Sequence, residues 1–217
     1  MDIETLYEAV ELVRKSGHDG DIRETTFMRT YPLLLEAAQA PIADPLDAFL
    51  RTASLAYGWM PAALTIDASL LAAAAKGLGA AIQERPLVSL EQVEPIAACL
   101  GSVTGAAVVL HLSNPSVFPL WGPRVERFRI RSRPSDYHMA QPRNYLSFIG
   151  EVQTIAAHPL FLTFHHEYCT AYQARLQRLR IPAYPLTEPR VIESAACELA
   201  APKESQWDSL ERGWPWI

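Results

Sequence analysis

Apolar residues recur at helical spacing along most of the chain. Near the N-terminus the apolar positions are three, four and seven residues apart, which predicts an amphipathic helix over residues 3–13. The same spacing predicts helices over residues 46–55, 145–155 and 160–179. No segment shows the alternation of apolar and polar residues that is typical of a half-buried strand. The sequence therefore predicts an all-α fold built from many helices.

Capping residues and glycines indicate where some of these helices begin and end. Asp44 and Pro45 predict a helix start, because an Asp side chain caps free helical amides and Pro fits the first turn. Thr65 or Asp67 is expected to begin an Ala-rich helix, which ends near the glycines at residues 77–79.

A pair of helices is predicted in the middle of the chain. Ser89 and Gln92 have the spacing of a capping box and predict the start of the first helix. Pro95 lies too deep for a first turn, so we expect this helix to be short or kinked. A break at residues 101–105 separates it from a second, apolar helix over residues 106–112.

Prolines largely determine the structure predicted for residues 114–142. Asn114 and Pro115 end the apolar helix, because the residue before a proline disfavours helical backbone. Residues 117–121 are expected to be extended, and residues 125–128 to form a short helix. Residues 129–142 are polar and contain two prolines, which predicts a surface loop.

A last helix is predicted to begin at Thr187 and Pro189 and to run through residue 199. We interpret residues 1–200 as a single all-helical domain, divided into two helical lobes. Residues 201–217 form a tail with three tryptophans, which we expect to dock on this domain.

Composition excludes several classes of protein. The chain has 217 residues, of which 49% are hydrophobic, and a formal net charge of −5, so it is not a disordered protein. Its three widely spaced cysteines fit a reducing compartment rather than a disulfide scaffold, and no zinc-type cysteine pair exists. The N-terminus lacks the pattern of a signal peptide, and polar residues interrupt the longest uncharged run. We therefore expect a cytoplasmic protein with no membrane partner.

The net charge conceals an uneven distribution of arginines. Of the 19 basic residues, 16 are Arg. Residues 121–190 contain ten arginines and five acidic residues, a net charge of +5, whereas the remainder carries −10. A protein with a negative total charge can therefore still have a positively charged surface that binds an anionic partner.

Residues 100–128 carry the most functional information. A tight turn at the start of a helix exposes backbone N–H groups, and such a helix terminus binds anions. Gly101 and Gly105 would allow a phosphate to approach closely, and Ser102 and Thr104 could add hydroxyl donors. Contacts of this kind position a nucleic-acid backbone without reading its sequence.

This segment resembles the helix-hairpin-helix DNA glycosylase superfamily, in which a hairpin and an apolar helix precede an extended stretch with the catalytic Asp. The Phe-Pro-Leu-Trp sequence after Asn114 and Pro115 is similar to a divergent branch of that family. The resemblance implies a two-lobed helical fold and a DNA partner. The residues that carry the match are Leu100, Gly101, Val103, Val108, Val109, Leu110, Phe118, Pro119, Leu120 and Val125.

The chain departs from that family at the positions that perform its chemistry. Gly122 occupies the position of the catalytic Asp, and Ala106, Ala107 and Val108 leave no counterpart for the hairpin Lys of bifunctional members. Asp136 could in principle supply a carboxylate from the following loop. The resemblance thus implies a degenerate glycosylase without activity, and the catalytic residues stay unassigned.

The arginines after the motif, to which Arg143 also belongs, could clamp phosphates through paired hydrogen bonds. If residues 129–133 were extended, their alternate arginines would project to one side. The alternative is a solvated loop whose arginines pair with the acidic half of the chain. Trp121 could stack on a base, or simply pack beside its neighbouring prolines. The candidate nucleic-acid-binding residues are Gly101, Ser102, Thr104, Gly105, Trp121, Arg124, Arg127, Arg129, Arg131 and Arg133.

Other chemistry-bearing residues favour ordinary structural roles. His165 and Cys169 share a helix face, but a metal site needs further ligands at a fixed spacing, so we expect no metal and no cofactor. His111 lies among leucines and is expected to be a hydrogen-bonded core residue. Cys99 and Cys197, like Cys169, have apolar neighbours typical of small core residues.

Three hypotheses about function follow. The first is a non-catalytic nucleic-acid or phosphate-binding protein, with DNA as its partner. The second is a helical protein-interaction module with no nucleic-acid role. The third is an active base-excision glycosylase with a relocated carboxylate. The missing Asp favours a binding role over an enzymatic one, and the sequence contains no Walker loop, dinucleotide fingerprint or serine-hydrolase elbow.

Overall fold

A computed structural model describes residues 1–16, 22–60, 62–83 and 88–200 of the chain. In these residues it contains helices and no strand, which confirms the predicted all-α class. The tryptophan-rich tail lies outside the described residues. No helix in the described ranges is long and apolar enough to cross a membrane. The helices are α1 (Ile3–Lys15), α2 (Ile22–Gln39), α3 (Pro45–Trp59), α4 (Leu71–Ala81), α5 (Leu90–Leu100), α6 (Val103–Ser113), α7 (Pro123–Ile130), α8 (Asp136–Met139), α9 (Pro142–Ala156), α10 (Phe161–Arg178) and α11 (Glu188–Leu199).

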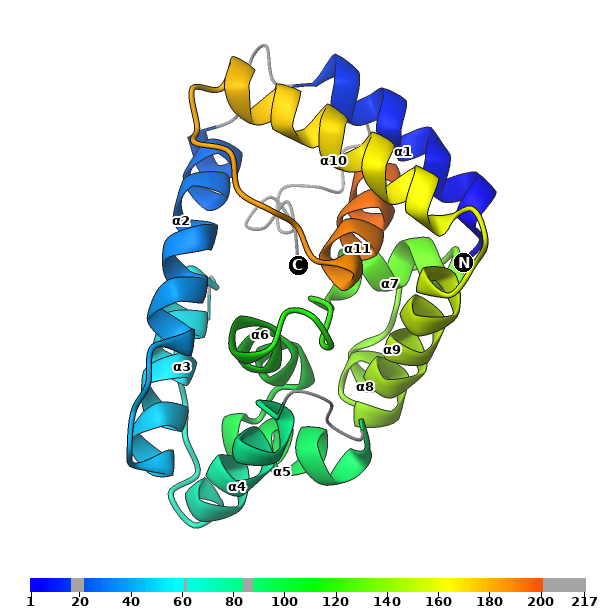
Figure 1. Cartoon of the computed structure of the whole chain (residues 1–217). Helices are drawn as coiled ribbons and strands as arrows, with labels where there is room; N and C mark the ends of the chain where they lie inside the picture. The colour runs from blue at the N-terminus through cyan, green and yellow to red at the C-terminus, as the bar shows by residue number, and fades with distance from the viewer. Residues whose placement is uncertain (17–21, 61, 84–87, 201–217) are drawn as a thin grey trace.

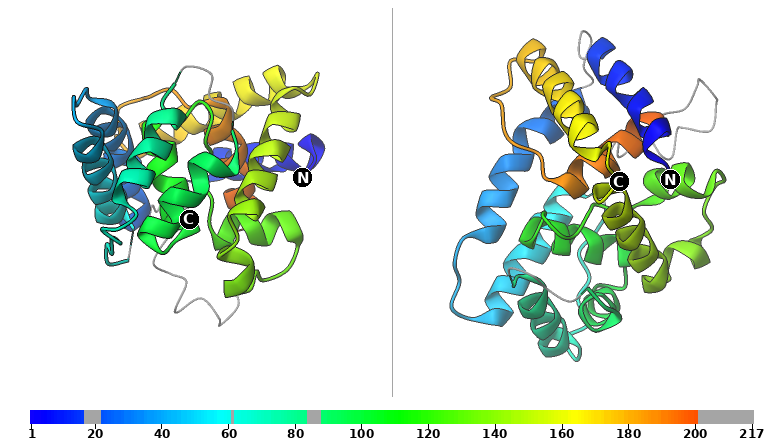
Figure 2. Two further views of the ribbon diagram at one scale, coloured as in Figure 1. Left: turned by 90° about the horizontal axis from the view of Figure 1, so that it is seen from below. Right: turned by 45° about the vertical axis from the view of Figure 1, so that its right-hand side comes forward.

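Two buried helices, α6 and α11, organise the packing. Helices α2, α3, α4 and α5 pack against α6, whereas α1, α7, α9 and α10 pack against α11 (Figure 1). Helix α9 also contacts α5 and α6, and so joins the two groups. The N-terminal helix α1 runs beside α10, late in the chain, as both Figure 1 and the right-hand view of Figure 2 show.

The two central helices are buried for different reasons. Helix α6 is apolar on all sides, and residues 105–112 are fully enclosed, as expected for a helix without a polar face. Helix α11 buries charged residues, so its core position requires polar partners inside the protein. Arg190 and Glu193, one turn apart, form a buried ion pair, and the Arg190 guanidinium lies 4.9 Å from the centre of the Tyr31 ring. The charges of Arg190 and Glu193 thus compensate each other within one turn of α11.

The predicted capping signals are confirmed where they were clearest. The Asp44 carboxylate accepts a hydrogen bond from the Leu46 amide at 2.7 Å and begins α3. The capping box at α5 is formed, because the Ser89 amide donates to the side-chain oxygen of Gln92 at 2.8 Å. Pro95 lies inside α5, which continues to Leu100.

The Ala-rich helix differs from its prediction at both ends. It begins at Leu71 rather than at Thr65 or Asp67, because the Asp67 carboxylate closes a local turn by accepting hydrogen bonds from the amide and hydroxyl of Ser69. It then continues through its glycines to Ala81. Gly77 permits close packing, because a Cβ there would lie 3.0 Å from the Gln92 carbonyl oxygen on α5.

Three other predictions need correction. The break at residues 101–105 is only two residues long, because Val103 already belongs to α6. The surface loop predicted for residues 129–142 includes the end of α7 and the short helix α8, which Ser135 caps. Helix α2 was not predicted, because Pro32 and several threonines obscure its pattern.

Several arginines stabilise the ends of helices to which they do not belong. Arg178 of α10 donates to the Val13 and Ser16 carbonyl oxygens at the end of α1. In the same way, Arg29 donates to carbonyl oxygens beyond α10, and Arg51 to carbonyl oxygens at the end of α2. The last carbonyl groups of a helix lack intrahelical partners and carry partial negative charge, so a guanidinium is a suitable cap.

Candidate functional site

The turn between α5 and α6 is held by backbone hydrogen bonds. Gly101 ends α5 in the left-handed region with φ of 61°, a conformation that glycine adopts without strain. The Ser102 amide donates to the Ala97 carbonyl oxygen at 3.0 Å, and the Gly101 amide to that of Ala98 at 3.3 Å. These bonds complete a Schellman motif, so α6 can begin directly after two turn residues.

Ser102 defines the start of α6. Its hydroxyl oxygen accepts a hydrogen bond from the Gly105 amide at 3.0 Å, and its carbonyl oxygen accepts from the Ala106 amide. The amides of Val103 and Thr104 belong to the first turn of α6, where a helix supplies no carbonyl partner of its own. This end of α6 therefore presents backbone donors, and the positive end of the helix dipole, beside the turn.

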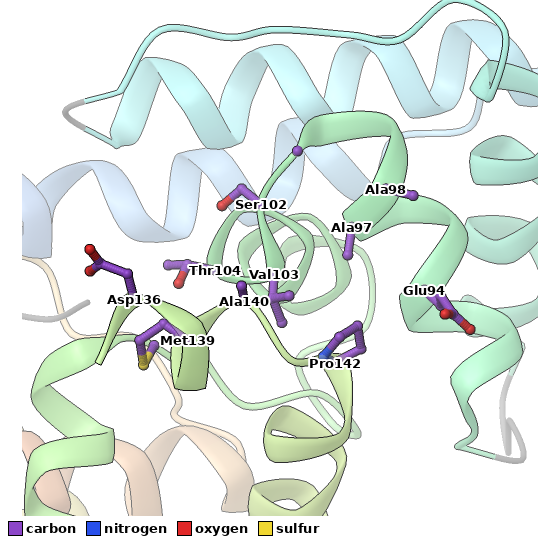
Figure 3. A pocket seen from close by; sticks show the side chains of 11 residues that line it. Glu94, Ala97, Ala98, Ser102, Val103, Thr104, Asp136, Met139, Ala140 and Pro142 are labelled. Carbon is purple, nitrogen blue, oxygen red and sulfur yellow. The ribbon is translucent and has the colours of Figure 1, made fainter. Parts of the chain in front are cut away.

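A pocket of about 430 Å³ opens at this turn. Figure 3 shows that the oxygen atoms of Ser102, Thr104 and Asp136 lie on one side of it, whereas Glu94 lies on the other. The described residues that line it include two carboxylates and two hydroxyl groups but no arginine. The lining residues are Glu94, Ala97, Ala98, Gly101, Ser102, Val103, Thr104, Asp136, Met139, Ala140 and Pro142.

Helix α8 forms one wall of the pocket and is fixed by polar contacts. It has only four residues, so its position depends on its surroundings rather than on its own helical hydrogen bonds. Ser135 caps it by accepting from the His138 amide at 3.2 Å, and the Asn144 side chain donates to the His138 carbonyl oxygen at 2.8 Å. The His138 imidazole contacts the Glu126 carboxylate, which ties α8 to α7.

Glu126 is a buried hub rather than a pocket residue. Its side chain has no exposed surface and accepts hydrogen bonds from Trp121 Nε1 at 2.9 Å, from Arg129 Nε at 2.7 Å and from His138. Burial alone would raise the pKa of Glu126, but the hydrogen bonds from Arg129, His138 and Trp121 outweigh it and lower that pKa. The carboxylate therefore stays ionised, and its oxygens are occupied.

Trp121 does not lie on the surface. Its side chain is fully buried, its ring centre lies 5.7 Å from that of Tyr145, and its Nε1 donates to Glu126. Of the two roles considered for Trp121, the structure shows packing in the core, so its place among the candidate nucleic-acid-binding residues is corrected.

The arginines that follow the motif do not form a single row. Arg129 points inward and pairs with Glu126 and with Glu151, the latter at 2.7 Å. Arg124 Nε donates to the Cys197 carbonyl oxygen at 2.9 Å, in the last turn of α11. These two arginines serve the fold, but the acidic partners of Arg129 belong to the arginine-rich segment itself and not to the acidic half of the chain that the alternative expected.

The remaining arginines lie nearer the surface. Arg127 is half-buried on α7, and Arg131 and Arg133 are exposed. The idea that Arg129, Arg131 and Arg133 project together from an extended strand is wrong, because Arg129 is helical and Arg131 ends α7 with φ of 56°.

The two glycines of the motif have structural explanations. The positive φ of Gly101 favours glycine in the turn itself. A Cβ on Gly105 would overlap the hydroxyl group of Tyr57, so this glycine admits a tyrosine of α3 and not a phosphate. Gly122, at the position where the resemblance places a catalytic Asp, is the buried N-cap of α7. Of the candidate nucleic-acid-binding residues, Gly101, Ser102 and Thr104 line the pocket, whereas Gly105, Trp121 and the five arginines do not.

Sequence reasoning missed one residue beside the pocket. Tyr137 of α8 is 77% exposed. The sequence did contain a signal for the helix that carries Tyr137. Ser135 is a favoured N-cap residue, and it marks the start of α8 within the segment that was expected to be a loop. Asp136, which the sequence analysis considered as a substitute carboxylate, lines the pocket through the same helix.

The other candidate residues occupy ordinary positions. His111 is fully buried between Tyr31 and Phe118, as predicted for a core histidine. The Cys169 sulfur lies 3.8 Å from His165 Nε2, and no group of three or more potential metal ligands occurs among the described residues. No family model, no curated protein and no solved structure matches the chain.

Proposed function

We propose that the chain is a non-catalytic nucleic-acid-binding protein that holds a nucleotide at the turn between α5 and α6. One observation carries this proposal: the donors of Ser102 and Thr104 and the carboxylate of Asp136 line the same open pocket. The resemblance of residues 100–128 to helix-hairpin-helix DNA glycosylases favours the same class of ligand.

The chemistry of the pocket suits a nucleotide better than a free phosphate. Amide and hydroxyl groups at a helix N-terminus bind a phosphate of the backbone. Asp136 and Glu94 would repel inorganic phosphate, but carboxylates accept hydrogen bonds from the amino groups of bases. The volume of about 430 Å³ also falls in the range of pockets that enclose small organic ligands.

The test is the binding of labelled oligonucleotides, measured by fluorescence anisotropy over a series of salt concentrations. We expect affinity to fall as salt rises, because bound phosphates release counterions. Thr104→Glu places a negative charge at the turn and should weaken binding about tenfold or more. Thr163→Glu, on the distant helix α10, is the matched control and should leave binding unchanged. A protein that forms no complex even at low salt would contradict the proposal and favour the protein-interaction alternative.

A second candidate is a base-excising glycosylase in which Asp136 provides the carboxylate. The observation that favours it is the position of Asp136 at the pocket, on the same side as the hydroxyl groups of Ser102 and Thr104. Its test is the formation of abasic sites on duplexes that carry damaged bases, with Asp136→Asn as the variant. Under the binding proposal the wild-type protein yields no abasic sites. Activity that Asp136→Asn abolishes would replace the binding proposal with this one.

A further inference from the structure

Tyr137 stands apart from the other aromatic residues of the described chain. Its side chain is 77% exposed, whereas every other described tyrosine, phenylalanine and tryptophan is buried or half-buried. A single exposed aromatic residue is common on protein surfaces, so its surroundings decide whether it can bind a ligand.

Tyr137 belongs to the helix that forms one wall of the pocket. On α8, Asp136, Met139 and Ala140 share the face that lines the pocket, since residues three and four apart lie on one side of a helix. Tyr137 belongs to the neighbouring, solvent-facing side. The backbone that carries it is fixed by Asn144 and by the contact between His138 and Glu126, so little ordering is required when a ligand binds.

Three exposed arginines lie within six residues of Tyr137 in the sequence. Arg131 and Arg133 precede α8, Arg143 follows it next to the pocket residue Pro142, and all three arginines are exposed. Exposed aromatic rings and exposed guanidinium groups together bind single-stranded nucleic acid, because bases stack on the rings and phosphates contact the charges.

We propose that Tyr137 stacks on an unpaired base of a single-stranded nucleic acid, whose adjacent phosphates lie against Arg131 and Arg143. This inference rests on the proposed nucleotide-binding function and adds the class of nucleic acid that is bound. In a duplex each base is already stacked on its neighbours and offers no free face to Tyr137. The site should therefore prefer a single strand to a duplex of the same length.

The experiment compares a labelled single strand with its duplex, using the full chain. We expect tighter binding of the single strand, and Tyr137→Ala should weaken it about tenfold, the usual cost of losing one stacked base. Tyr137→Trp keeps a stacking surface and should retain the affinity. Leu162→Ala is the matched control, because Leu162 is also 77% exposed but lies on α10.

Two further measurements separate stacking from charge. A 2-aminopurine base in the strand should lose fluorescence when it stacks on Tyr137, and Tyr137→Ala should abolish that loss. Tyr137→Ala removes no charge and should leave the salt dependence unchanged, whereas Arg143→Ala should reduce its slope by about one phosphate contact. Circular dichroism of each variant reports whether it is folded.

The outcomes distinguish this inference from the proposed function. If oligonucleotides bind but Tyr137→Ala changes neither affinity nor 2-aminopurine fluorescence, the stacking role is wrong and the nucleotide site stands. Equal affinity for single strand and duplex would likewise overturn the preference inferred here. If the wild-type protein binds neither form at low salt, both the function and the stacking role are overturned.

Discussion

The Tyr31 hydroxyl donates a hydrogen bond of 2.8 Å to Nε2 of His111, although the two residues are 80 positions apart. On the other side of the ring, Nδ1 lies 2.7 Å from the Phe118 carbonyl oxygen. A carbonyl oxygen can only accept, so Nδ1 carries a hydrogen, and the lowered pKa of the ring leaves Nε2 free of a proton to accept from Tyr31. Burial, with a further contribution from the charge of Arg190, lowers the pKa of His111 from 6.5 to about 3.

This neutral histidine predicts that mild acid destabilises the fold. The unfolded chain takes up a proton at the ordinary pKa of 6.5, whereas the folded chain resists it down to about 3. Below about pH 6 the free energy of unfolding should therefore fall by up to about 1.4 kcal/mol per pH unit from this group. Urea unfolding of the wild type and of His111→Gln at several pH values measures the effect, because the glutamine variant should have a shallower dependence on pH.

Tyr31→Phe is the control for that experiment. It removes the hydrogen bond to His111 and should cost about 1 kcal/mol at every pH, but it leaves a titratable imidazole in the core. Its pH dependence should stay close to that of the wild type. Identical slopes in all three proteins would show that His111 does not contribute to acid sensitivity.

Glu126→Gln should be among the most damaging single changes. The amide keeps the shape of the side chain but removes the charge that pairs with Arg129, and breaking a buried pair costs about 3 kcal/mol. Glu151→Gln, whose carboxylate is one-third exposed and contacts the same arginine, should cost less than about 1 kcal/mol. Equal losses in chemical denaturation would contradict the assignment of Glu126 as the hub.

The two glycines of α4 should respond to alanine in opposite directions. Gly79→Ala meets no atom within 4 Å and should stabilise the protein by about 0.5–1 kcal/mol, because alanine favours the helix. Gly77→Ala brings a Cβ to 3.0 Å from the Gln92 carbonyl oxygen and should destabilise the protein by about 1 kcal/mol. Thermal unfolding of the two variants tests this prediction. A rise in stability from both substitutions would mean that α4 and α5 separate easily.

Substitutions should show that the two turn glycines, Gly101 and Gly105, stabilise the fold for different reasons. Gly101→Ala should cost about 1 kcal/mol through its positive φ, and Gly101→Asn should cost less, since asparagine tolerates that conformation. Gly105→Ala should be destabilising through overlap with Tyr57, and adding Tyr57→Phe should recover part of the loss. A double variant no more stable than Gly105→Ala would point to a different cause.

Most of the helices, and the residues that cap their N-termini, could be predicted from the sequence. Asp44 and Ser89 act on neighbours two or three residues away, so their effects could be predicted locally. Helix α2 could not be predicted, because its position depends on packing against α3 and α6. The same holds for Gly77, which depends on contact with Gln92 of another helix.

Only those parts of the candidate site that depend on contacts between residues close in the sequence could be predicted. Gly101 and Ser102 form the expected turn through bonds within a few residues. The direction of Arg129 could not be predicted, since it is decided by Glu126 and by Glu151 on α9. Nor could the sequence indicate that α8 would return to this turn, because that depends on the contacts of His138 and Asn144.

The arginine cap on α1 has a consequence for how the chain is made. Arg178 reaches the end of α1 across 162 positions, and α1 packs on α10 and α11. During synthesis the apolar face of α1, with Leu6 and Val10, leaves the ribosome before its partners exist. At about 5–20 residues per second that interval is on the order of ten seconds. Helix α1 is thus synthesised well before the helices that cover its apolar face.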